Sequence, residues 1–420
     1  MTRSASEAVS PRAGAATGIR AVAGFAQPSF VGVREAFIEN FERRGELGAA
    51  CCVFHRGEKV VDLWGGIRNK ATGEPWEEDT MALVHSTTKG LAGLAMALAH
   101  SRGLLDYDER VSTYWPDFAQ HGKGGITVRQ LLSHQAGLFA LDERPTRSLV
   151  ADPDRLALVL ARQKPAWPPG TRQAYHGITL GFYESELLRR VDPGRRSLGR
   201  FFQDEIATPL GLEFYIRLPE EIPDSRLAPL QRFDMATALF ALPLPLALAA
   251  MNPRSRFRRA LLGSELPAQS DRIYARNLEV PAGGGVGTAR AMAQAYSVFA
   301  TGGRELGLRE ETLRQLMALA VPPARGFRDA CLKVEIQFSL GFAKPSPKNP
   351  FAHPSSFGSP GTGGSFAFAD PHARIGYAYV PNQMGARLED PREAALRRAM
   401  YRSIGEPAAG QSSLPDAGIP

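Results

Sequence analysis

The sequence predicts an α+β fold in which strands from both ends of the chain form one antiparallel sheet, flanked by helices and interrupted by a mostly helical lobe. Two β-hairpin patterns carry this prediction. Residues 48–66 are rich in strand formers around a turn at Arg56 and Gly57, and residues 363–382 show the same pattern around Asp370 and Pro371. The long segment between them has mostly helical periodicity. A single sheet completed by the C-terminal strands accommodates both patterns.

Eight segments have the apolar spacing and end signals of helices. They are residues 85–102, 128–134, 153–163, 177–191, 198–207, 288–301, 310–319 and 391–403. We expect residues 1–26 to be a flexible lead-in and residues 405–420 a flexible tail. Residues 27–404 are expected to form a single domain whose helical lobe covers roughly residues 104–285.

The composition excludes several classes of protein. The chain has 420 residues, of which 44% are hydrophobic and 22% charged, as in a globular protein with a sizeable core. Its three cysteines, Cys51, Cys52 and Cys331, cannot build a disulfide framework and lack zinc-site spacing, so we expect a reducing, cytoplasmic location. The net charge of +7 comes from basic residues scattered among 43 acidic ones, and it therefore indicates no nucleic-acid partner.

The most apolar run covers residues 235–251. It is too short to span a bilayer comfortably and contains Pro243 and Pro245. We interpret it as a buried helix or as a lid over a pocket, in preference to membrane contact, and we expect no stable membrane insertion. The basic run at residues 254–259 is interpreted as a solvated loop or helix face.

A candidate nucleophile stands at the start of the predicted helix 85–102. Ser86 and Lys89 are three residues apart, which places both side chains on one helix face. Serine is a poor nucleophile until a base is adjacent, and a desolvated lysine can be neutral and act as that base. Free N–H groups at the helix start, including that of Ser86, can stabilise an oxyanion. Taken without their context, residues 86–89 are better explained by an N-cap serine beside a solvent-facing lysine.

The surrounding sequence resembles the serine β-lactamase-like superfamily, and within it the bacterial carboxylesterases called family VIII. Residues 126–138, ITVRQLLSHQAGL, match that family's T-x-R-x-L-L-x-H-x-S/A-G-L segment, and the similarity runs from about Phe30 to Ile404. The resemblance implies a β-lactamase/transpeptidase-like fold. It also implies that Ser86 forms an acyl-enzyme and that Lys89 is its proton partner.

The second motif of the family is a tyrosine on a loop, matched here by Tyr175, His176 and Gly177. The resemblance implies that Tyr175 relays the serine proton to the leaving group. Gly177 replaces the asparagine that contacts the substrate amide in β-lactamases. Because no G-x-S-x-G elbow supports a Ser-His-Asp triad, His176 is expected in the wall of the substrate pocket.

The third motif, K-T-G, corresponds to residues 359–361, where Ser359 replaces the lysine. In β-lactamases that lysine helps to hold a substrate carboxylate, so its loss favours a neutral ester. We expect Ser359, Gly361 and Gly363 to line the substrate site, and the N–H of Thr362 to be the second oxyanion donor.

The resemblance therefore predicts a serine carboxylesterase that acts on short-chain acyl esters through Ser86, Lys89 and Tyr175, with a small-molecule substrate. No metal or cofactor motif is present: the eight histidines form no H-E-x-x-H cluster, and the glycine-rich run at residues 283–287 lacks a dinucleotide-binding context. β-Lactam or D-alanyl peptide hydrolysis and acyl transfer remain alternatives on the same scaffold. A catalytically silent binding protein is the alternative of another class. The oligomeric state is left open.

Overall fold

The computed structural model describes residues 22–232, 244–262, 276 and 278–406. Its main sheet contains nine described strands in the order β1-β3-β2-β13-β12-β11-β10-β9, with β4 paired to β3. All pairings in this sheet are antiparallel. The strands are β1 (Ala23–Ala26), β2 (Gly48–His55), β3 (Glu58–Asn69), β4 (Glu74–Pro75), β9 (Gln337–Ser339), β10 (Phe342–Lys344), β11 (Phe357–Pro360), β12 (Phe366–Asp370) and β13 (Ile375–Pro381).

The two predicted hairpins lie side by side at the centre of this sheet. β2 and β3 are joined through Arg56 and Gly57, whose φ angles of 55° and 85° are the left-handed values of a tight two-residue turn. β12 pairs with β13, and β13 pairs with β2, so that Cys52 stands opposite Ala378. Strands from the two ends of the chain thus share one sheet, which confirms the predicted fold class.

The outermost strand corrects the predicted lead-in at residues 1–26. Ala23–Ala26 forms β1, which pairs with β3 from Ala23 opposite Trp64 onward. Gly24 allows this close approach, because a Cβ there would lie 1.9 Å from the carbonyl oxygen of Asp62. The prediction of flexibility is therefore wrong for β1. Residues 1–21 and most of the predicted tail, 407–420, lie outside the described residues.

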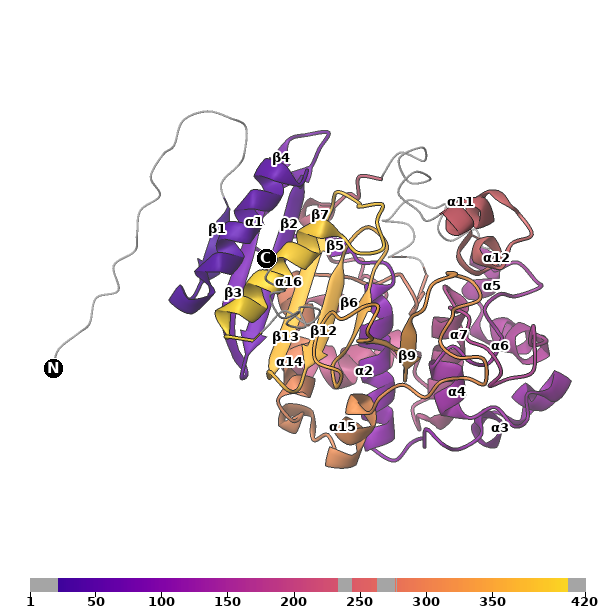
Figure 1. The fold of residues 1–420 in the computed structure, drawn as a ribbon. Coiled ribbons are helices and arrows are strands. Elements are labelled where there is room, and N and C mark those ends of the chain that lie inside the picture. The colour runs from indigo at the N-terminus through magenta and orange to yellow at the C-terminus, as the bar shows by residue number, and fades with distance from the viewer. Residues whose placement is uncertain (1–21, 233–243, 263–275, 277, 407–420) are drawn as a thin grey trace, which may run out of the picture.

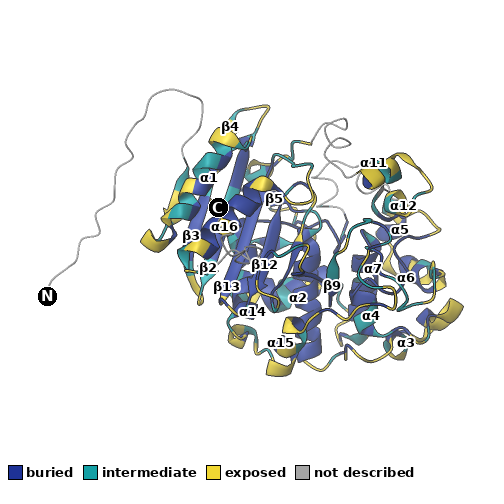
Figure 2. Cartoon of the chain, viewed as in Figure 1, coloured by how far each residue is buried: buried dark blue, intermediate teal, exposed yellow. Residues whose placement is uncertain are grey.

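Helices cover both faces of the main sheet (Figure 1). α1 (Val31–Arg43) and α16 (Pro391–Ser403) pack together against one face, where Phe37, Leu396 and the outward strand residues form one buried cluster. α2 (Thr87–Ser101) and α14 (Ala289–Ala300) lie on the other face. Every residue of α2 is buried, because it runs between the sheet and the helical lobe. Figure 2 shows the same burial across the central strands.

The remaining elements form most of the inserted lobe and its connections. All eight predicted helices are present, as α2, α4, α6, α7, α8, α14, α15 and α16, whereas α1, α3, α5 and α9 were not predicted. The lobe and its neighbours contain α3 (Val111–Tyr114), α4 (Val128–Leu132), α5 (Arg147–Val150), α6 (Pro153–Arg162), α7 (Thr179–Val191), α8 (Leu198–Phe202), α9 (Thr208–Leu210), α11 (Leu244–Met251), α12 (Arg256–Leu262) and α15 (Glu310–Met317). A second, small sheet joins β6 (Phe214–Tyr215), β8 (Val286–Gly287), β5 (Met81–Leu83) and β7 (Leu227–Ala228).

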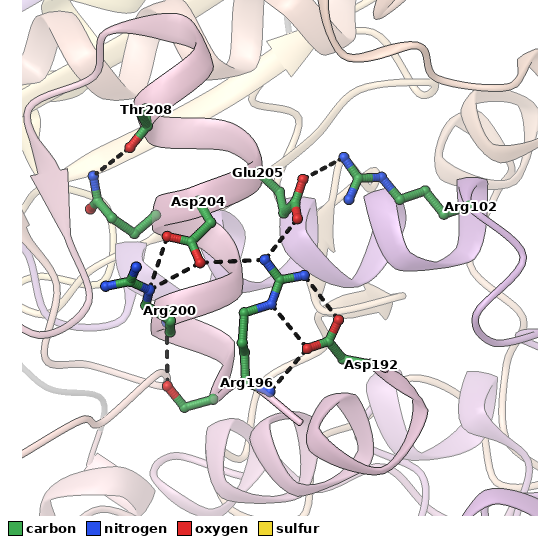
Figure 3. A network of polar contacts seen from close by, with 9 residues as sticks. Arg102, Asp192, Arg196, Arg200, Asp204, Glu205 and Thr208 are labelled. Carbon is green, nitrogen blue, oxygen red and sulfur yellow. Dashed lines mark hydrogen bonds and ion pairs between the residues drawn. The ribbon is translucent and has the colours of Figure 1, made fainter. Parts of the chain in front are cut away.

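An arginine-centred network ties the lobe to the end of α2 (Figure 3). Arg196 forms ion pairs with Asp192 at 2.9 Å, Asp204 at 3.3 Å and Glu205 at 2.7 Å. Glu205 also pairs at 2.7 Å with Arg102, the residue that caps the C-terminus of α2. Glu205 lies in the π-helical turn Gln203–Ala207, which continues α8. α2, whose N-cap residue is Ser86, is therefore anchored at its C-terminal end by the lobe.

Candidate active site

Ser86 lies at the N-terminus of α2, directly after β5. The glycine-rich loop before α14 holds the backbone on both sides of it. Val84 donates its N–H to the carbonyl of Gly285 at 3.0 Å, and the N–H of Gly285 donates to the Thr88 hydroxyl at 2.9 Å. A Cβ on Gly285 would lie 2.7 Å from that hydroxyl, so glycine permits the close approach. This loop therefore positions the serine.

Lys89 lies one helical turn after Ser86, and its side chain is buried. Its Nζ donates to the carbonyl oxygens of Gly177 at 2.7 Å and Ala282 at 2.6 Å, and lies 3.2 Å from Ser86 Oγ. Carbonyl oxygens only accept hydrogen bonds, so they fix two N–H bonds of the amine. The remaining tetrahedral position on Nζ therefore points at Ser86 Oγ.

Tyr175 reaches the same oxygen from the loop that precedes α7. Its hydroxyl donates to Ser86 Oγ at 2.8 Å, and its ring centre lies 4.9 Å from Lys89 Nζ. Phe338 of β9 stacks on the tyrosine ring with a centroid distance of 5.5 Å. The structure thus brings Ser86, Lys89 and Tyr175 into contact, although Tyr175 is 89 residues away from Ser86 in the chain.

Two histidines hold the backbone on either side of Tyr175. His134 accepts the N–H of Ala174 on its carbonyl and the N–H of His176 on Nδ1, both at 3.0 Å. His176 donates from Nδ1 to the Ala174 carbonyl at 2.7 Å and accepts the N–H of Leu138 on Nε2 at 3.0 Å. His134 belongs to the segment 126–138 that the sequence singles out. Its role in the structure is to position Tyr175.

Burial keeps both imidazoles neutral. It lowers the pKa of His134 well below the ordinary value, with smaller contributions from His176 and Lys89. Burial likewise lowers the pKa of His176 to about 4. Because the His176 ring is buried and both of its nitrogens are hydrogen-bonded within the protein, it is not available to a substrate. His176 was predicted to contact the substrate from the pocket wall, and this prediction is corrected to a supporting role beside Tyr175.

The β11–β12 segment lies directly against the backbone around Ser86. Ser359 donates its hydroxyl to the carbonyl of Ser86 at 2.7 Å, so the prediction that Ser359 contacts the substrate is corrected: this hydroxyl supports the backbone of Ser86. Ser365, which the sequence did not single out, donates to the Val84 carbonyl at 2.9 Å. A Cβ on Gly361 would lie 2.3 Å from the same carbonyl, so glycine is required for the two segments to meet.

The two backbone amides predicted to bind an oxyanion have no hydrogen-bond partner among the described residues. Among the residues that the structure describes, neither the N–H of Ser86 nor that of Thr362 donates to another residue. Thr362 is exposed at the tip of the β11–β12 loop, next to buried Gly363, whose carbonyl accepts the N–H of Gly385 at 2.9 Å. Gly363 has a φ angle of 97°, which lets the loop turn back on itself.

Gly177 has no room for a side chain. A Cβ there would lie 2.7 Å from the carbonyl oxygen of Ala260 and 2.5 Å from Leu261 Cδ2, both in α12. An asparagine at this position would therefore require α12 to move. The Gly177 carbonyl also binds Lys89, so α12 packs against the segment that holds this lysine.

Glu184 of α7 is a buried acid near the site that the sequence did not reveal. Its carboxyl is fully buried, and neither oxygen has a hydrogen-bond partner among the described residues. Burial raises the pKa of Glu184 to about 8, and the charge of Lys89 opposes this rise. A buried acid without partners is best accommodated in its protonated form. The sequence alone does not reveal this burial, because a single glutamate in an amphipathic helix is usually exposed to solvent.

The unfolding free energy is expected to fall with pH because of Glu184. In the unfolded chain its carboxyl ionises near pH 4.5, whereas in the folded protein it keeps its proton to about pH 8. Between these values unfolding releases a proton, which favours the unfolded state by about 1.4 kcal/mol per pH unit. Urea titrations of the wild type and Glu184→Gln between pH 5 and 8, with exposed Glu310→Gln as control, should show a shallower decline for Glu184→Gln. Parallel slopes for all three proteins would contradict the buried acid.

The chain is similar to a known protein family over most of its length. The family model described as Beta-lactamase matches residues 33–400. The esterase/beta-lactamase LipL of Mycobacterium tuberculosis is 31% identical over 87% of this chain and 84% of its own length. A crystal structure of a family VIII carboxylesterase has 35% identity and a TM-score of 0.79, covering 91% of this chain and all of the other. A penicillin-binding protein homologue from Caulobacter crescentus has 33% identity and a TM-score of 0.77, covering 91% of this chain and all of the other.

The family match covers most of the chain and includes the serine, lysine and tyrosine that meet in the structure. The relatives and structural neighbours are esterases and β-lactamase-fold hydrolases, as the resemblance implied. The chain therefore belongs to the beta-lactamase family and is a serine hydrolase similar to the family VIII carboxylesterases.

Proposed function

We propose that the protein is a carboxylesterase that hydrolyses short-chain acyl esters through an acyl-enzyme on Ser86. The observation that carries the proposal is the convergence of Lys89 Nζ, at 3.2 Å, and the Tyr175 hydroxyl, at 2.8 Å, on Ser86 Oγ. A serine hydroxyl becomes a competent nucleophile when a neighbouring group takes its proton. Here two groups that can exchange a proton are in contact with it.

In the proposed acylation step, Ser86 Oγ attacks the ester carbonyl while its proton passes to Lys89 Nζ, a step for which the amine must present a lone pair. The two N–H bonds of the amine stay on the carbonyls of Gly177 and Ala282, so this transfer requires no movement of heavy atoms. When the bond to the alcohol breaks, Tyr175 donates its hydroxyl proton to the leaving oxygen, and the proton on Lys89 restores the tyrosine. The alcohol leaves, and the acyl group remains on Ser86.

The free amides of Ser86 and Thr362 are the proposed donors to the oxyanion that forms in each tetrahedral intermediate. In deacylation a water molecule attacks the acyl carbonyl and gives its proton to the Lys89–Tyr175 pair. The same proton then returns to Ser86 Oγ as the acid leaves. This sequence restores the free enzyme with every proton accounted for.

The substrate is proposed to be a neutral ester because two contacts for β-lactams are missing. Ser359 stands where relatives place a lysine, so a substrate carboxylate finds no cation there, and its hydroxyl is bonded to Ser86. At Gly177, α12 occupies the space that an asparagine side chain would need. Recognition of a carboxylate and of an amide side chain are therefore both disfavoured.

A panel of p-nitrophenyl esters of increasing acyl length, run beside nitrocefin, tests this preference. We expect kcat/KM for the acetate or butyrate ester to exceed that for nitrocefin by ~100-fold or more, because two polar contacts to the β-lactam are absent. Comparable turnover of nitrocefin would instead indicate a β-lactamase. A large acceleration by added alcohol, with a new ester as product, would indicate an acyltransferase.

A further inference from the structure

α11 exposes an apolar face that the rest of the described chain does not cover. Leu244, Leu248 and Met251 are 71%, 58% and 65% exposed, and their spacing places them on one side of the helix. Leu246, on the opposite side, is buried. The interpretation of residues 235–251 as a buried helix is thus wrong for the outer face of α11, and residues 235–243 lie outside the described residues. In Figure 2 the exposed residues of α11 are coloured yellow.

A basic segment continues directly from this apolar face. Residues 244–262 contain four arginines and no carboxylate. Among the described residues only Arg259 of these four forms an ion pair, with Asp142 at 3.0 Å. Arg258 donates to the Ala250 carbonyl at 3.1 Å, which places its guanidinium at the end of α11. Arg254, Arg256 and Arg258 are exposed, and the Arg256 guanidinium lies over the Trp167 ring, 5.5 Å from its centroid. Exposed positive charge without a carboxylate partner among the described residues therefore follows the exposed leucine and methionine side chains along the chain.

We propose that α11 and the arginines that follow it form a docking surface for an anionic lipid bilayer. The apolar side chains would enter the boundary between headgroups and acyl chains, while the guanidinium groups would bind lipid phosphates. This combination favours a lipid surface over a protein partner, because unpaired cations and apolar side chains are both satisfied at one headgroup boundary. Among the described residues we find no helix that could span a bilayer. The proposed association is with the bilayer surface.

The docking surface is connected to the active site. α11 and α12 pack together, and Ser255 between them donates its hydroxyl to the Ala249 carbonyl. Ala260 and Leu261 of α12 contact Gly177, whose carbonyl binds Lys89. A chain bound through α11 would therefore hold its active site close to the lipid. The lipid surface itself is inferred from α11 and its arginines and does not depend on the proposed esterase activity.

Vesicle co-sedimentation of the full chain tests the surface. We expect binding to phosphatidylcholine–phosphatidylglycerol vesicles and much weaker binding to pure phosphatidylcholine. The double variant Leu248→Glu/Met251→Glu should lower the partition coefficient on anionic vesicles by ~10-fold or more, and so should Arg254→Gln/Arg258→Gln. Both variants should keep wild-type turnover of soluble p-nitrophenyl butyrate, which shows that they fold and separates this test from that of the esterase.

A matched control is Leu319→Glu/Val321→Glu, which adds the same charge at two similarly exposed residues, 67% and 61%, just after α15. It should bind vesicles like the wild type. The proposal is overturned if the wild type does not bind anionic vesicles, or if the α11 variants bind as well as the control. Concentration-dependent dimerisation that only the α11 variants abolish would assign the surface to a second copy of the chain instead.

Discussion

Replacing Ser86 by alanine is expected to lower kcat/KM for p-nitrophenyl butyrate by ~10⁴-fold or more, as removal of the nucleophile does in other serine hydrolases. The substitution removes one oxygen, on which the Lys89 and Tyr175 contacts converge. Steady-state assays on purified protein measure the effect. Since α2 is held by the sheet and by the lobe, the fold should survive, and thermal unfolding followed by circular dichroism checks this.

Ser356→Ala is the matched control for this change. Ser356 is also buried, and its hydroxyl has no partner among the described residues. It should therefore keep full activity. If Ser86→Ala retained activity within a few-fold of Ser356→Ala, Ser86 would not be the nucleophile.

Replacing Lys89 by methionine should lower kcat by ~10³-fold, the scale of a lost general acid–base group. The change also leaves the carbonyls of Gly177 and Ala282 without a buried donor, which costs stability. Activity must therefore be measured per folded molecule, with the free energy of unfolding from urea titration alongside.

Lys123→Met separates the two effects of that substitution. Lys123 is buried as well, and its Nζ donates to the carbonyls of Ala161 and Gln163, both at 2.6 Å, with no serine beside it. Its replacement should cost a similar amount of stability but leave kcat unchanged. An equal loss of kcat in both variants would show that Lys89 acts only through the fold.

Much of the fold could be predicted because its signals are local. The Arg56–Gly57 turn between two runs of strand formers indicated the first hairpin. α6 begins with two helix-start signals, Asp152 as N-cap and Pro153 as its first residue. β1 and α1 carry weaker signals: β1 has four residues, and α1 mixes charged residues into its apolar spacing. Their conformation depends on packing against β3 and α16, which are distant in the sequence.

The candidate site shows the same difference between local signals, which the sequence reveals, and contacts between distant segments, which it does not. Spacing on one helix puts Ser86 and Lys89 together, whereas the resemblance to a family was needed to identify Tyr175. The supporting contacts were not predictable, because they join distant segments. The hydrogen bond from the Ser359 hydroxyl to the Ser86 carbonyl joins residues 273 positions apart in the sequence. The bond from Lys89 to the Ala282 carbonyl joins residues 193 positions apart. The exposure of α11 likewise follows only from tertiary structure.

Mass spectrometry of the protein labelled with a fluorophosphonate tests the central claim most directly. The reagent forms a stable adduct with an activated serine hydroxyl, and tryptic mapping locates it. Labelling of a single residue, Ser86, at a rate that falls sharply in Lys89→Met, is the predicted result. Labelling of another residue, or the absence of an adduct in protein that still hydrolyses p-nitrophenyl butyrate, would contradict an acyl-enzyme on Ser86.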